Sequence, residues 1–174
     1  CKFAGSMVMV VMAPYMVKMG VGAGHNLSKL IELGPALILQ EFGNLGTIFL
    51  TLPVALLLGL KKEAIGACYS INRDVNLGLT TDVFGAEASE TRGTFAVYIT
   101  GAVVGTIFAS LMVSIIASLD IFHPLALGMA AGVGSSSMMA AMTGTLSTFY
   151  PEYAEQMGVL AGASDMLTGA DGIF

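Results

Sequence analysis

Three serines follow a pair of glycines in the middle of an apolar stretch, at residues 132–137. The stretch, residues 124–149, is of membrane-spanning length and contains no charged residue. Glycine lets a helix open, and serine hydroxyls can hydrogen-bond a solute or the neighbouring backbone. Open backbone inside lipid is tolerated only where it is buried in protein or lines a wet cavity. The sequence therefore predicts a helix that Pro124 begins and that is broken here, with Ser135, Ser136 and Ser137 lining a site. Hydroxyls that bond only to helix carbonyls are the alternative.

A second polar group interrupts the apolar residues 35–60. Gln40 and Glu41 precede Asn44, and Gly43 and Gly46 flank it. We interpret this as a half-helix, a polar break and a second half-helix; a surface helix followed by a short span from Gly46 is the alternative. A charged side chain at the centre of a membrane helix costs roughly 2.5–3.5 kcal/mol. Glu41 therefore needs a partner, a proton or a cavity, and it is a candidate for proton or sodium coupling together with Asn44.

Charges and amides mix at residues 70–76, beside a short apolar segment. Asn72, Arg73, Asp74 and Asn76 could bind an ion at an unwound helix, as in broken transporter helices. A local Arg73–Asp74 contact in a solvated loop is the alternative. Residues 64–84 are too polar to span a membrane simply, so a loop or a segment that dips into the membrane is expected.

The last apolar segment, residues 154–174, carries two acidic residues. Asp165 and Asp171 are six apart, so they do not share one helix stripe. Asp165 lies nearer the middle and is the better candidate for an intramembrane carboxylate. We expect ion coupling through Glu41, Asp74 or Asp165.

Composition favours a polytopic, all-α membrane protein. The chain is 55% hydrophobic and 11% charged, whereas soluble domains have about 25% charged residues. Seven Lys and Arg residues and a net charge of −5 speak against a nucleic-acid partner. The histidines and cysteines are scattered, so we expect no metal site and no other cofactor. We also expect no catalytic residue, because His123 precedes Ser135 by about 18 Å of helix.

We expect five spans, at residues 3–21, 35–60, 93–119, 124–149 and 154–174. If the first span begins in the cytoplasm, more of the positively charged residues lie on the cytoplasmic side than outside, in agreement with the positive-inside rule. The inner residues are Lys2, Lys61, Lys62, Arg73 and Arg92, and the outer ones are Lys18 and Lys29. A five-span unit suits one half of an inverted-repeat transporter. Residues 1–174 are thus expected to be one transmembrane domain, the C-terminal half of a protein with about ten spans.

Four motifs, at residues 34–47, 66–76, 123–129 and 132–141, resemble an uncharacterised family of bacterial integral-membrane proteins, a domain of unknown function. The resemblance covers residues 34–171. The family's second motif reads Arg-Glu-Pro-Asn, whereas this chain has Asp74 and Val75 in the middle positions. More distantly, the pattern is similar to the superfamily of bile-acid/sodium symporters, lysine exporters and aspartate–alanine exchangers. That resemblance implies two inverted repeats with crossing broken helices, breaks at residues 72–76 and 132–137, and polar residues at Ser164 and Asp165 after the second break.

These features together predict a secondary transporter of the bacterial cytoplasmic membrane. It would move a small organic or amino-acid-like solute, coupled to Na⁺ or H⁺, with residues 132–137 facing residues 72–76. A channel or passive pore, or a non-transporting membrane subunit, is the alternative. The expected partners are the lipid bilayer and the solute, and a homodimer is left open.

Overall fold

The structure, a computed structural model, describes residues 34–68 and 73–171 together with positions 14, 17, 21 and 31. At residues 41, 43–45, 47, 73–75, 170 and 171 it describes the backbone alone. Every element in the described ranges is a helix, and these ranges contain no strand. This agrees with the all-α class. The predicted first span, residues 3–21, lies almost wholly outside the described residues.

The first long helix, α3 (Gly34–Leu57), runs without interruption through residues 43–46. The predicted polar break at this point is therefore wrong. Each glycine inside a helix costs only about 1 kcal/mol relative to alanine. Opening the helix would leave backbone groups unpaired, at several kcal/mol each in an apolar surrounding. Two glycines and one asparagine are thus too weak a signal to end a helix.

Three short elements follow α3: η1 (Lys62–Ala64), α4 (Ile65–Cys68) and, after a gap in the description, α5 (Arg73–Phe84). Helix α4 packs closely against the start of α6 (Ser89–Thr100). A Cβ atom built on Gly66 would lie 2.6 Å from the carbonyl carbon of Gly93. Of the predicted break at residues 72–76, only Asn72 lies outside the described residues. The backbone is helical from Arg73 onward, so the prediction of a break is wrong for residues 73–76.

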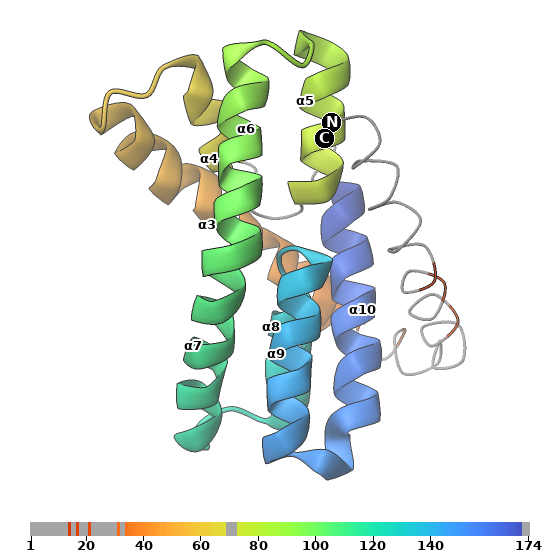
Figure 1. The fold of residues 1–174 in the computed structure, drawn as a ribbon. Coiled ribbons are helices and arrows are strands. Elements are labelled where there is room, and N and C mark those ends of the chain that lie inside the picture. Colours follow the sequence, from red (N-terminus) through yellow and green to blue (C-terminus); the bar gives the residue numbers. More distant parts are fainter. Residues whose placement is uncertain are drawn as a thin grey trace.

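Helix α6 continues through a π-helical turn, η2 (Gly101–Gly105), into α7 (Thr106–Ser118). Together they form one continuous helix of 30 residues, Ser89–Ser118, which contains an 18-residue window with a mean hydropathy of 2.2. Within the described part of the chain, this is the one helix long and apolar enough to cross a membrane. It corresponds to the predicted span at residues 93–119. Figure 1 shows it as the long green helix beside the other elements.

The remaining chain forms α8 (Pro124–Ala131), α9 (Ser136–Phe149), η3 (Pro151–Tyr153) and α10 (Ala154–Asp171). Pro124 begins α8, as predicted, because the first helical position needs no backbone N–H. Helices α7 to α10 lie alongside one another (Figure 1). Their shared core consists of Ala109, Val113, Ala117, Leu127, Ala131, Met142, Leu146 and Met157.

Helices α8 and α9 form a hairpin, and this corrects the prediction of a single span over residues 124–149. His123 before α8 and Tyr153 after α9 lie at the same end, with ring centroids 5.7 Å apart. At the other end, Figure 1 shows the chain turning back on itself between the two helices. Helices of eight and 14 residues are about 12 and 21 Å long, so neither could cross a hydrocarbon layer of about 30 Å.

Candidate functional site

The tip of the α8–α9 hairpin is the predicted helix break. Helix α8 ends at Ala131, and the backbone of Gly134 has a φ of 136°, a conformation that only glycine adopts readily. Ser135 then caps α9: its backbone is extended, and its Oγ accepts a hydrogen bond from the backbone N–H of Met138. The break is therefore confirmed. Gly134 allows the chain to reverse its direction, and Ser135 caps the start of the next helix.

The tip is pressed against α10. A Cβ atom on Gly132 would overlap the carbonyl oxygen of Ala161 and lie 2.5 Å from the Cβ of Ser164. One helical turn earlier, a Cβ on Gly128 would lie 2.8 Å from the Cα of Met157. The two glycines let α8 run beside α10 at close backbone distance. This contact fixes the hairpin tip next to the polar side chains of α10.

Ser136 and Asp165 meet at this contact. The Ser136 hydroxyl donates a hydrogen bond to Asp165 Oδ2 over 3.1 Å, although the residues are 29 positions apart. Ser136 is 4% exposed and Asp165 is 8% exposed. A buried carboxylate is costly unless hydrogen bonds or a positive charge compensate it. The hydroxyl supplies one such bond, and the predicted residues Ser136 and Asp165 are thus brought together.

The other two predicted serines lie beside this pair. The Oγ atoms of Ser135 and Ser137 are 3.0 Å apart, which is hydrogen-bonding distance. Ser135 is buried, whereas Ser137 is exposed. The hairpin tip therefore presents hydroxyl groups both toward α10 and toward the outside of the bundle.

Helix α3 adds a contact that was not among the predicted binding residues. Gln40 Nε2 donates a hydrogen bond to Ser164 Oγ, and Ser164 is fully buried. The signal in the sequence was a glutamine within an apolar run, directly before Glu41. Its partner could not be identified, because nothing local connects residue 40 with residue 164.

The other predicted site residues fall into two groups. The backbones of Glu41, Asn44, Arg73 and Asp74 are helical, but their side chains lie outside the description, as does all of Asn72. Asn76, by contrast, is described and is 1% exposed, on α5. That residues 72–76 face residues 132–137 stays a prediction.

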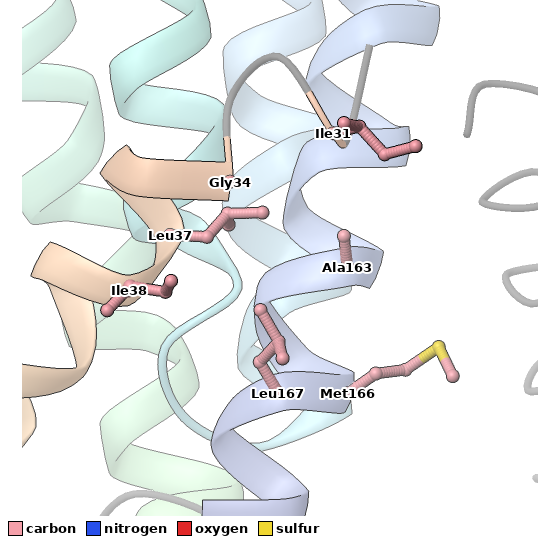
Figure 2. A pocket seen from close by; sticks show the side chains of 7 residues that line it. All are labelled: Ile31, Gly34, Leu37, Ile38, Ala163, Met166 and Leu167. Atoms are coloured by element: carbon pink, nitrogen blue, oxygen red, sulfur yellow. The ribbon is translucent and has the colours of Figure 1, made fainter. Parts of the chain in front are cut away.

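An apolar pocket of about 520 Å³ is lined mainly by α3 and α10, the two helices that the Gln40–Ser164 hydrogen bond joins (Figure 2). Ala163 and Leu167 on α10 directly precede the buried polar residues Ser164 and Thr168. On α3, Leu37 lies one turn before Gln40. Helices α3 and α10 thus provide both the apolar pocket and the Gln40–Ser164 hydrogen bond. The lining residues are Ile31, Gly34, Leu37, Ile38, Ala163, Met166 and Leu167.

The chemistry available at the tip is hydrogen bonding around one acidic group. Among the described residues, no cluster of three or more histidine, cysteine or acidic side chains could hold a metal ion. Hydroxyl groups, an amide and a carboxylate can bind a small polar solute or a monovalent ion.

In the part of the chain that the structure describes, every element is a helix, one helix is apolar and of membrane-spanning length, and a helical hairpin carries serines at its tip. The whole chain, residues 1–174, matches the family described as "Protein of unknown function (DUF3100)", and the chain belongs to this family. The predicted membership of an uncharacterised family is therefore confirmed. Comparison with curated proteins finds no match, and comparison with solved structures finds none either. The more distant resemblance to bile-acid/sodium symporters and their relatives gains no support from these comparisons.

Proposed function

We propose that this protein is a polytopic membrane protein that transports a small organic or amino-acid-like solute, coupled to Na⁺ or H⁺. The observation that carries the proposal is the buried Ser136–Asp165 hydrogen bond at the tip of the α8–α9 hairpin. Irregular backbone at membrane depth is tolerated where it is packed in protein or lines a cavity. In transporters, such interrupted helices bind the solute and the coupling ion.

The exposed surface supports a membrane setting. Large apolar side chains point outward along α3 and α7, including Phe49 and Leu50, each 74% exposed, and Phe108, 63% exposed. Soluble monomers rarely expose contiguous apolar surface of this kind, whereas lipid favours it. We propose that the protein lies in the bacterial cytoplasmic membrane and that the Ser89–Ser118 helix crosses it.

The hairpin changes the proposed topology. Helices α8 and α9 would enter the membrane from the end where α7 stops and return to the same end, where α10 begins. Of the five predicted spans, four would then cross the membrane and residues 124–149 would be re-entrant. An even number of crossings removes the odd-span argument for an inverted repeat. The proposal of transport rests instead on the hairpin tip.

The roles of the residues follow from their chemistry. The Asp165 carboxylate would bind the coupling ion, and the hydroxyls of Ser135, Ser136 and Ser137 would bind the polar part of the solute. The apolar pocket beside Gln40 and Ser164 would hold a hydrocarbon portion. Glu41 and Asp74 remain proposed additional coupling residues.

Uptake into liposomes tests the proposal. Reconstituted protein should take up solutes from a panel of radiolabelled amino acids and small organic acids, with saturation, only when a Na⁺ or H⁺ gradient is imposed. Glu41→Gln and Asp165→Asn variants should lose the dependence on the gradient. Uptake unchanged in both variants would rule out these coupling residues. Flux without saturation or ion dependence would indicate a passive pore, and the absence of flux would indicate a non-transporting subunit.

A further inference from the structure

A row of buried polar side chains lies where α5 packs against α6. Asn76 and Thr80 are four residues apart on α5, and Thr91 and Thr94 are three apart on α6, so each pair shares one helix face. All four residues are at most 5% exposed. This row belongs to a different pair of helices from the Ser136–Asp165 contact.

The three threonine hydroxyls all have backbone partners. Thr80 Oγ1 donates to the carbonyl oxygen of Asn76 over 2.9 Å, and Thr94 Oγ1 donates to that of Glu90 over 3.0 Å. Thr91 Oγ1 lies 2.7 Å from the carbonyl oxygen of Gly85 and 3.1 Å from that of Thr80. Each hydroxyl has used its hydrogen, and lone pairs on the three oxygens remain available as acceptors.

The Asn76 amide differs from these threonines. Among the described residues, neither its Nδ2 nor its Oδ1 has a hydrogen-bond partner, and both atoms are shielded from solvent. A buried amide with both ends unpaired is among the costlier arrangements in a folded protein, because it has given up its bonds to water. A leucine at this position would avoid that cost. A buried group of this kind therefore calls for a partner from outside the described residues.

We propose that Asn76 binds a small uncharged group that offers one hydrogen-bond acceptor to Nδ2 and one donor to Oδ1. A water molecule, or the hydroxyl or amide of a solute, has this chemistry. A bare cation would bind Oδ1 and leave the Nδ2 hydrogens unpaired. An anion would bind Nδ2 and place its negative charge beside Oδ1. The inference does not depend on transport, since it concerns a separate pair of helices and is read out through stability.

Thermal unfolding of the purified chain in detergent tests the proposal. Asn76→Leu keeps a similar volume and removes the amide, and Thr94→Val is a matched control at a buried polar side chain that already has a partner. If water fills the position, Asn76→Leu lowers Tm by about 3–10 °C in plain buffer. If only a solute fills it, Asn76→Leu raises Tm in plain buffer. Acetamide or ethylene glycol then raises the Tm of the wild type and of Thr94→Val, but not that of Asn76→Leu. Sodium acetate and ammonium chloride raise the Tm of none of the three proteins.

A higher Tm for Asn76→Leu in buffer, with no selective effect of the neutral probes on the wild type, would overturn the proposal. Infrared spectroscopy of protein carrying ¹³C at asparagine side-chain carbonyls gives a second reading that does not need a folded leucine variant. The band lost in Asn76→Ser should have the frequency of a hydrogen-bonded amide in at least one of the solutions above. A free-carbonyl frequency in all of them would contradict the proposal.

Discussion

The Ser136 hydroxyl donates its hydrogen bond to Asp165 Oδ2 at the point where α9 begins and α10 passes the hairpin tip. The bond connects an N-terminal helical turn to a buried carboxylate on a neighbouring helix. Because both side chains are buried, it contributes to the stability of the hairpin as well as to the proposed site.

Loss of this bond should destabilise the fold. Ser136→Ala leaves Asp165 without its hydroxyl donor, and hydrogen bonds to charged groups contribute about 1.5–3 kcal/mol. We expect Ser136→Ala to lower the free energy of unfolding in detergent by this amount. In a double-mutant cycle with Asp165→Ala, which removes the acceptor, the two effects should be strongly non-additive. Additivity within about 0.5 kcal/mol would show that the residues do not interact.

Close packing at the hairpin tip predicts a sharp contrast between two glycines. In Gly132→Ala, the new methyl group would overlap Ala161 and Ser164, so the fold should lose about 1–3 kcal/mol. Gly144 is also helical, on α9, but a Cβ there would meet nothing within 4 Å. Gly144→Ala should therefore be neutral or gain up to about 1 kcal/mol. Equal unfolding midpoints for the two variants would contradict the packing of α8 on α10.

The start of α8 depends on His123. Its Nδ1 accepts a hydrogen bond from the backbone N–H of Leu125 over 3.2 Å. His123→Ala removes this cap and should cost about 0.5–2 kcal/mol, whereas His123→Asn restores an acceptor and should cost less. Circular dichroism during thermal unfolding measures both. An asparagine variant as unstable as the alanine variant would show that the cap does not matter.

Tyr150 connects the end of α9 to the end of α7. Its hydroxyl lies 3.0 Å from the carbonyl oxygen of Ala117 and 3.2 Å from Asp120 Oδ1. Burial, together with the hydrogen bond and the negative charge of Asp120, raises the pKa of Tyr150 above its usual 10.0. The protonated form is thus favoured in the folded state, so this stabilisation is complete below pH 10 and is lost as pH rises through the higher folded-state pKa.

Alkaline titration followed by tyrosinate absorbance checks this prediction. The signal that Tyr150→Phe removes should titrate above the range of an ordinary tyrosine. Asp120→Asn should move the pKa back toward that range, because it removes the negative charge. An unchanged titration in Asp120→Asn would show that the carboxylate does not act on Tyr150.

The position of the hairpin tip could be predicted from the sequence, but the reversal of the chain between α8 and α9 could not. Gly132, Gly134 and the serines predicted a break, since their backbone freedom and capping ability are local properties. The reversal of the chain depends on the packing of α8 along α10, a contact between residues far apart in the sequence. The same limitation applies to Ser136 with Asp165 and to Gln40 with Ser164. At residues 43–46 the glycines and Asn44 led to a wrong prediction of a break. The free-energy cost of a glycine inside a helix is smaller than the cost of leaving backbone groups without hydrogen bonds.

The central claim is that solute binds at the tip of the α8–α9 hairpin, and gradient-driven uptake by matched serine variants tests it most directly. Ser147 is the control: it lies on the same helix, and its hydroxyl bonds to the Gly144 carbonyl, away from Asp165. At equal amounts of reconstituted protein, Ser136→Ala should reduce kcat/KM for uptake at least about tenfold. A tenfold reduction corresponds to the loss of one hydrogen bond that contributes about 1.4 kcal/mol. Ser147→Ala should match the wild type. Equal uptake by wild type, Ser136→Ala and Ser147→Ala would contradict a solute site at the hairpin tip.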